Sequence, residues 1–281
     1  MRNSKETREI APREPGLPTE LVARLQEYDV FGQAEPGELV LPVWRLVQGT
    51  TRTADARRAG WFYNPVLDDY KEELHVAIFA RRKSRSLFAE GDFGSPPLCA
   101  SDDGIRPRQT VVVGGVQTGP TCAECPFSQW GSARGGSGRG QACRLADNLL
   151  CYDLEEGEAN WGVGVLRVTG VSLGPWRRYL TGGRFSRLPS AAVETVVTAE
   201  LQRFEAGQAY VMRFRRGGVL RPETMRLVTE IALSYGGAQV PVEGEEAGEM
   251  EELLDEAPRD RAEPRREVEG EAPRRRRLFD E

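Results

Sequence analysis

The alternation of apolar and polar positions predicts a chain built mainly from β-strands. In the segment 73–90, Leu74, Val76 and Ile78 alternate with their neighbours, and this period of two is typical of a half-buried strand. Segments that are rich in β-branched and aromatic residues and bounded by turn residues predict further strands at 37–49, 148–155 and 161–171.

Two further apolar segments, 192–204 and 208–216, predict a hairpin that turns near Glu205, Ala206 and Gly207. Five or six strands in about 200 residues favour a small antiparallel barrel or sandwich that carries insertions. Because helical patterns do not alternate with the strands, a parallel α/β sheet is disfavoured.

Helical spacing is found in only a few places. Segment 17–28 predicts a short helix capped by Thr19, and segment 174–183 predicts a short helix or a turn. In segment 221–235, Pro222 suits a first helical turn, and Met225, Val228, Ile231 or Ala232, and Tyr235 recur at helical spacing. We expect that stripe to pack against the core.

The chain divides into an N-terminal arm (1–36), a body (37–242) and a tail (243–281), and charge sets the tail apart from the rest. The tail holds 15 acidic and 8 basic residues, whereas residues 1–242 hold 28 acidic and 30 basic ones. With so few apolar residues the tail cannot offset its ordering entropy, so we expect it to be disordered. We find no apolar run of about 18 residues and no apolar stretch near the start, which predicts a soluble, cytoplasmic protein with no membrane partner.

Arginine supplies all but three of the 38 basic residues. A GC-rich genome or a hot habitat would produce this bias. It would also serve a protein whose guanidinium groups stack on bases and bind phosphates in a bidentate manner.

The stretch TCAECPFSQWG contains a Cys-x-x-Cys pair, Cys122 and Cys125. A redox pair would sit at the start of a helix after a strand, but here Pro126 lies beyond the pair and glycine-rich sequence surrounds it. A disulfide fits poorly with a reducing compartment. Zinc is favoured, because a Cys-x-x-Cys turn supplies two of the four thiolates that a tetrahedral site needs.

Cys99 and Cys143 would supply the other two thiolates, within a module at about 97–147. The glycine-rich polar sequence between them cannot pack a core of its own, so a metal would provide its nucleus. The fifth cysteine, Cys151, lies in an apolar strand and is interpreted as a buried thiol.

Signatures of catalysis are missing from the sequence. The single histidine, His75, is followed by Val76 and Ala77, and Thr121 rather than proline precedes Cys122, so the zinc deaminase pattern fails. We find no phosphate-binding loop with its lysine, and the Asp68-Asp69 and Asp102-Asp103 pairs are typical of turns. We therefore expect a protein that is not an enzyme and interpret His75 as a core or surface residue.

Aromatic and basic residues interleave in several places, which favours a surface for single-stranded nucleic acid, since bases stack on aromatic rings and phosphates bind cations. Each place alone would also fit a core aromatic beside a solvated charge. The candidates are Trp44, Arg45, Phe62, Phe79, Arg81, Arg82, Lys83, Arg85, Phe88, Trp176, Arg177, Arg178, Arg213 and Arg215. The acidic tail would either compete with phosphate for this surface and recruit partner proteins, or serve only solubility.

The order of these features resembles a family of bacteriophage single-stranded DNA-binding proteins. Four stretches of residues 37–235 carry the resemblance: LPVWRLVQGTTR followed by AGWFYN, the basic strand leading into PPLCASDDG, the TCAECPFSQWG turn, and Cys143 with RLADNLLCYDLE. The ending RRRRLFDE departs from the acidic tip that is common in such proteins, although Phe279 would still serve as an anchor.

The resemblance implies an oligonucleotide/oligosaccharide-binding (OB) barrel that carries a zinc insertion. One structural Zn²⁺ would be held by Cys99, Cys122, Cys125 and Cys143. Such a protein coats or delivers single-stranded DNA in phage replication or recombination, in the host cytoplasm, with replication or recombination proteins as partners. Two alternatives stay open: a zinc-ribbon adaptor that docks on a protein such as RNA polymerase, and a metal-dependent nuclease.

Overall fold

A computed structural model describes residues 41–49, 51, 54–89, 96–133, 140–157, 160–205, 207–238 and 240–242 of the chain. The predicted helix at 17–28, the first part of the predicted strand at 37–49 and the acidic tail lie outside these residues. None of the helices formed by the described residues has both the length and the apolar character needed to cross a membrane.

The described residues form mainly β-structure, as the sequence predicts, in one nine-stranded sheet and one small hairpin. The strands are β1 (Val43–Leu46), β2 (Phe62–Asn64), β3 (Asp69–Lys71), β4 (Leu74–Leu87), β5 (Cys99–Ser101), β6 (Val112–Val113), β7 (Val116–Gln117), β8 (Cys143–Asp153), β9 (Val163–Thr169), β10 (Val193–Phe204) and β11 (Gly207–Val219). The helices are α3 (Leu173–Phe185) and α4 (Pro222–Tyr235), with short 3₁₀ turns at η2 (Ala56–Arg58), η3 (Pro126–Ser128), η5 (Gly170–Ser172) and η6 (Ser190–Ala192).

The large sheet has the order β11-β10-β4-β8-β9-β1-β2-β3, and β5 pairs with β4 beyond this path. Its neighbours are antiparallel except for the parallel pair β1–β9. The predicted segments at 73–90, 148–155 and 161–171 correspond to β4, β8 and β9, and the predicted hairpin to β10 and β11. The two later helical segments are also confirmed, as α3 and α4.

Both faces of the sheet are buried over part of their area. On the inner face, α3 covers a cluster that includes Leu149 and Leu166, and the ring of Trp176 on α3 lies 5.2 Å from that of Phe214 on β11. On the outer face, a second cluster includes Leu150 and Val165 and is covered by the end of α4 and the residues after it. Period-two alternation along β8 and β9 therefore supplies two apolar layers.

A β-bulge in β4 lets one strand serve both layers. The register with β8 shifts between Ile78 and Ala80, so that Phe79 is the extra residue. Ile78 belongs to the inner cluster, whereas Phe79 and Ala80 pack with the outer one. A bulge bends its strand and strengthens the local twist, which helps the sheet to curl.

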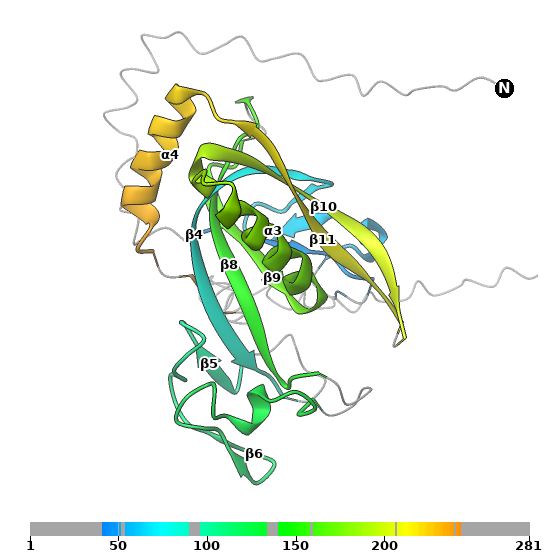
Figure 1. Cartoon of the computed structure of the whole chain (residues 1–281). Helices are drawn as coiled ribbons and strands as arrows, with labels where there is room; N and C mark the ends of the chain where they lie inside the picture. Colours follow the sequence, from blue (N-terminus) through cyan, green and yellow to red (C-terminus); the bar gives the residue numbers. More distant parts are fainter. Residues whose placement is uncertain are drawn as a thin grey trace, which may run out of the picture.

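The sheet curls into a half-barrel in which side chains link its distant strands (Figure 1). The side chain of Gln48, which follows β1, donates to the carbonyl of Tyr210 and accepts from its amide, both at 2.9 Å. Ser172 Oγ accepts from the amide of Met212 at 3.0 Å. A Cβ atom at Gly60 would lie 2.6 Å from the Tyr210 ring, so only glycine permits this close approach.

The chain between β4 and β8 forms an insertion that contains β5, the β6–β7 hairpin and η3. In Figure 1 it lies at the lower end of β4 and β8, away from α3 and α4. The β10–β11 hairpin also extends beyond the sheet, because β10 pairs with β4 only at Thr195–Val197 and with β11 along the rest of its length. The body thus carries two projecting parts.

Candidate functional site

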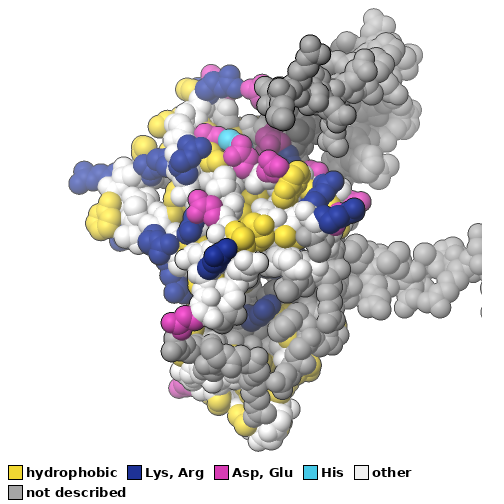
Figure 2. Space-filling view, turned by 90° about the vertical axis from the view of Figure 1, so that its right-hand side faces the viewer, with side chains coloured by type: hydrophobic (Ala, Val, Ile, Leu, Met, Phe, Trp, Pro, Cys, Tyr) yellow, Lys and Arg dark blue, Asp and Glu magenta, His cyan; other side chains and the backbone are white. Residues whose placement is uncertain are grey.

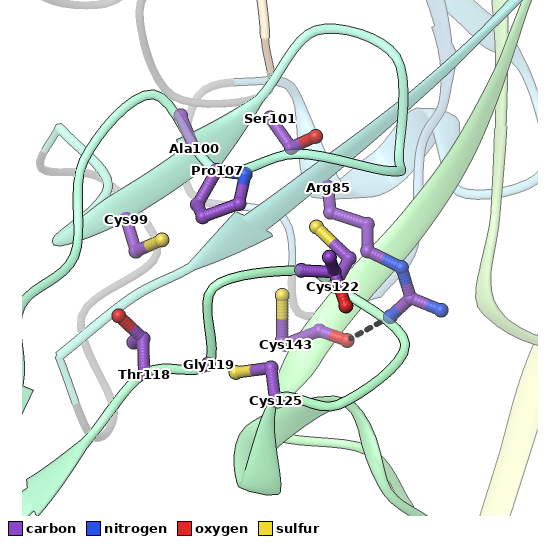
Figure 3. Close-up of a pocket in the computed structure, with 11 residues that line it drawn as sticks. Arg85, Cys99, Ala100, Ser101, Pro107, Thr118, Gly119, Cys122, Cys125 and Cys143 are labelled. Atoms are coloured by element: carbon purple, nitrogen blue, oxygen red, sulfur yellow. Dashed lines mark hydrogen bonds between the residues drawn. The ribbon is translucent and has the colours of Figure 1, made fainter.

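Four of the five cysteines meet in the insertion, as Figure 3 shows. Cys99 on β5 and Cys143 on β8 both pair in register with Leu87 of β4, one from each side. They are therefore two strands apart, a backbone separation of about 10 Å. The Cys122–Cys125 turn reaches the same place, and all four cysteines line one cavity of about 10 Å³, roughly the room of one water molecule.

The turn that carries Cys122 and Cys125 is held by a set of short-range bonds. Thr121 Oγ1 accepts from the amide of Glu124 at 3.3 Å and donates to its carboxylate at 2.9 Å. Ser128 Oγ, in η3, contacts the carbonyls of both cysteines, at 2.9 Å for Cys125. Hydrogen bonds among nearby residues thus hold the turn without a metal ion.

Burial sets the protonation of these thiols. It raises the pKa of Cys99, and it raises the pKa of Cys143 to about 12 against the opposing effect of Arg85. Without a cation these two thiols are therefore protonated at neutral pH. A metal ion has to displace their protons, so its binding depends on pH.

The donor set fits zinc, since four thiols and no carboxylate line the cavity. In the described part of the chain, however, no three His, Cys, Asp or Glu side chains stand close enough to hold an ion as they are. The four thiols would have to move inward around the metal. A zinc ion with four thiolates has a net charge of about −2, and Arg85, which donates to the carbonyl of Cys143 at 3.3 Å and lines the cavity, is placed to offset it.

The remaining cysteine and the histidine lie elsewhere. Cys151 is fully buried in the inner cluster, which confirms the interpretation as a buried thiol, and burial raises its pKa. All five cysteines are free thiols. His75, at the other end of β4, lies 2.6 Å from Glu194 and 3.1 Å from Glu73 and forms a surface ion-pair cluster.

Four of the predicted stacking aromatics belong to the core, which corrects that expectation. Trp44, Phe62 and Trp176 are at most 2% exposed and belong to the inner cluster, and Phe88 is 7% exposed. Phe79 packs half-buried under the outer layer. Alternation does not tell which face of a strand is covered, and packing has decided it here.

Four of the predicted arginines have hydrogen-bond partners within the protein. Arg81 binds the buried carboxylate of Asp147 with contacts of 2.7 to 3.0 Å, and Arg82 donates to the carbonyl of Gly236. Arg213 donates to Glu200 at 2.7 Å, and Arg85 has the contact with Cys143 given above. These hydrogen bonds link the arginines to other parts of the fold in the absence of a ligand.

The other basic candidates lie at or near the surface: Lys83 on β4, Arg177 and Arg178 on α3 and Arg215 on β11 are exposed, and Arg45 on β1 is half-buried. Figure 2 views the molecule from the side on which the β10–β11 hairpin projects. Lys and Arg side chains are spread over much of this side, while acidic side chains gather around the single histidine. These five residues lie on four different elements, β1, β4, α3 and β11.

The sequence pattern did not single out three features that the structure reveals. Trp130, at the end of the cysteine turn, is 78% exposed. Arg58 lies over the ring of Tyr70, which stacks on Tyr63 at 4.5 Å. A third feature is the cross-strand row of Arg82, Asn148 and Arg167 on the outer face. Trp130 is part of the motif, but exposure cannot be inferred from spacing.

Comparison of the chain with protein-family models, with curated proteins and with solved structures found no match. A function therefore has to be inferred from the fold and the site.

Proposed function

We propose that this protein binds single-stranded DNA without catalysis, through an OB-like body with a zinc-stabilised insertion. The observation that carries the proposal is the arrangement of five strands. The meander β4-β8-β9 is followed by α3 and then by the β10–β11 hairpin, whose first strand pairs with β4. That order and the position of the helix match the Greek-key path of an OB barrel, which supports the assignment.

The body departs from a closed barrel at one seam. The third strand, β9, pairs with the added strand β1 and not with β11. The contacts of Gln48 with Tyr210 and of Ser172 with Met212 span the gap instead. OB barrels are partly open, so this seam is compatible with the proposal.

The two projecting parts occupy positions that serve nucleic-acid binding in OB domains. Those domains use the connection between the first two strands and the connection between the last two. Here the first is the four-cysteine insertion and the second is the tip of the β10–β11 hairpin. Exposed Trp130 would offer a stacking surface, and exposed Arg177, Arg178 and Arg215 would attract the phosphate backbone.

The proposal also includes a metal ion and protein partners. One structural Zn²⁺ would bind Cys99, Cys122, Cys125 and Cys143, and the acidic tail would recruit replication or recombination proteins. By the resemblance to bacteriophage proteins, such a role would belong to phage DNA replication or recombination in the host cytoplasm.

The test is a titration of the zinc-assayed protein with fluorescent oligo-dT and with a matched duplex, at two salt concentrations. We expect about one zinc per chain and a preference for the single strand that weakens steeply with salt. Trp130→Ala should weaken oligo-dT binding without loss of fold, by roughly 1–3 kcal/mol. Phe185→Ala, which removes another exposed aromatic, is the matched control. Equal affinity for the duplex would overturn the proposal.

One observation favours a second candidate, the zinc-dependent protein adaptor. The insertion exposes apolar side chains, with Ile105 62%, Val112 67% and Trp130 78% exposed. An exposed apolar surface of this kind fits a protein partner. Full zinc content with no DNA binding in the same titration would decide for the adaptor.

A further inference from the structure

The outer face of the sheet carries a buried polar row. Arg82 of β4 pairs in register with Asn148 of β8, which pairs with Arg167 of β9. Asn148 and Arg167 are only 1% and 3% exposed. Arg167 Nε donates to Asn148 Oδ1 at 2.9 Å, and Asn148 Nδ2 donates to Ser84 Oγ at 2.9 Å. Two guanidinium groups thus flank an amide across three adjacent strands, on the same face as apolar Leu150 and Val165.

The residues after α4 cover this row. The carbonyl of Gly236 accepts from Arg82 Nη2, and the carbonyl of Pro241 accepts from Arg167 Nη2. In Figure 1 the chain that leaves α4 turns in behind β4, on the side of the sheet opposite α3. We call residues 236–238 and 240–242 the strap.

Apolar side chains of the strap pack against the outer layer of the sheet. Val242 is its only fully buried side chain among the described residues, and Ala238 and Val240 are half-buried against the outer cluster. It begins with two glycines, Gly236 and Gly237, which leave the backbone free to pivot beyond α4. Lifting the strap would break the two arginine–carbonyl bonds, among other contacts, and would expose part of the outer cluster.

A DNA strand would compete well for the same arginines. A neutral carbonyl gives each guanidinium one hydrogen bond, whereas a phosphate offers charge-assisted, bidentate bonds that are roughly twice as strong. The chain itself supplies a similar charge directly after the strap, because residues 243–256 contain eight acidic residues and no basic one. The strap thus joins the arginine row to a polyanionic segment.

We propose that the row of Arg82, Asn148 and Arg167 contacts the phosphates of single-stranded DNA, and that the strap covers it until DNA displaces the strap. This inference rests on the proposed function and adds the binding face and its regulation. Apparent DNA affinity is then lowered by the fraction of molecules whose strap is open. A strap closed nine-tenths of the time would weaken binding about tenfold.

The first test is hydrogen exchange of the full chain with and without saturating oligo-dT. We expect the amides of the strap to exchange faster in the complex, because DNA would take their place on the arginines. Unchanged or slower exchange in the strap, with oligo-dT bound, would overturn the inference.

The second test loosens the strap in the full chain with Val242→Ser. We expect oligo-dT to bind about threefold to tenfold more tightly, since the open fraction rises. Val47→Ser removes an equally buried valine after β1 and separates loss of stability from release of the strap. Equal affinity of the two variants for oligo-dT would contradict the proposal that the strap covers the binding face.

A third variant, Arg82→Gln, separates this inference from the proposed function. It should speed exchange in the strap without DNA and also weaken oligo-dT binding by about tenfold. If the wild-type chain binds oligo-dT but Arg82→Gln leaves both readouts unchanged, the strap is wrong and the proposed function stands. If neither the wild-type chain nor Val242→Ser binds oligo-dT, the proposed function itself fails.

Discussion

The sheet body and the four-cysteine insertion are stabilised by different means. The body packs large apolar side chains such as Trp44, Trp176 and Leu149 between its sheet and α3. Among the described residues, the buried cluster of the insertion holds Leu87, Cys99 and Cys143, and two of these are thiols. Half-buried apolar residues pack against it: Val111, Val113, Phe127 and Ala142. Burying apolar area holds the first region together, whereas the second buries less of it and, under the proposed zinc site, would depend on the metal. Predictions follow from this contrast.

Removal of the metal should have the largest effect, and only on the insertion. Structural zinc contributes on the order of 10 kcal/mol to small modules, so Cys122→Ser or a strong chelator should leave residues 96–142 open to protease while the sheet persists. Metal analysis and limited proteolysis measure this. The control is Cys151→Ser, which changes a cysteine in the core of the sheet. We expect that variant to retain the zinc ion of the insertion. If chelation unfolded the whole chain, the body and the insertion would not be stabilised separately.

The body should respond most to loss of Trp176. This side chain is 2% exposed and packs against Tyr179 and Phe214. Trp176→Ala should lower the free energy of unfolding by about 3–5 kcal/mol, measured by denaturant titration, with zinc content unchanged. Zinc loss in a folded variant would show that the two regions are coupled.

A smaller change should disturb the insertion alone. A Cβ atom at Gly119 would lie 2.8 Å from the amide nitrogen of Cys125, where backbone cannot give way easily. Gly119→Ala should weaken zinc binding by an overpacking strain of about 1–3 kcal/mol, measured by chelator competition. Gly183→Ala on α3, where a Cβ meets nothing within 4 Å, is the control and should not weaken it.

The smallest effect should be a response to pH that has opposite sign in the two regions. His75 donates a hydrogen bond to the carboxylate of Glu194, and this bond raises the pKa of His75 and lowers the pKa of Glu194. The hydrogen bond between His75 and Glu73 raises the pKa of His75 to a smaller extent. The stabilisation by charged His75 is full below its unfolded pKa of about 6.5 and is lost as pH rises through the raised folded pKa. The contribution of Glu194 is lost instead as pH falls through its lowered pKa.

His75→Gln should therefore lower the free energy of unfolding near pH 6 by at most about 1 kcal/mol, as for a partly exposed ion pair, and by less at pH 9. Zinc binding should change in the other direction and weaken as pH falls, because the buried thiols must lose protons. Denaturant titrations and chelator competition at both values measure the two effects. An equal loss of stability at both pH values would show that His75 does not contribute through its charge.

Particular residues show how far sequence reasoning reached. The period of two at Leu74, Val76 and Ile78 and the helical spacing in 221–235 were enough to predict β4 and α4. The positions of the four cysteines were enough to predict that they lie together. The bulge at Phe79, by contrast, has no period of its own and was missed.

The nucleic-acid candidates show where the reasoning stopped. Trp44 and Trp176 look like stacking residues beside arginines, yet both are buried, while Trp130 is exposed. Charge complementarity was also hidden, because Arg81 pairs with Asp147, 66 positions away in the chain. Partners so distant in sequence leave no local pattern.

The sequence by itself determined the strand and helix segments, the gathering of four cysteines and the separation of a weakly basic body from an acidic tail. Those properties depend on periodicity, on spacing and on charge counts, all of which are local or additive. Only the tertiary structure decided which faces are covered, which arginines have partners and where the strap crosses the row of Arg82, Asn148 and Arg167. Burial and long-range hydrogen bonds arise when distant segments meet, so they belong to the fold and not to any stretch of the chain.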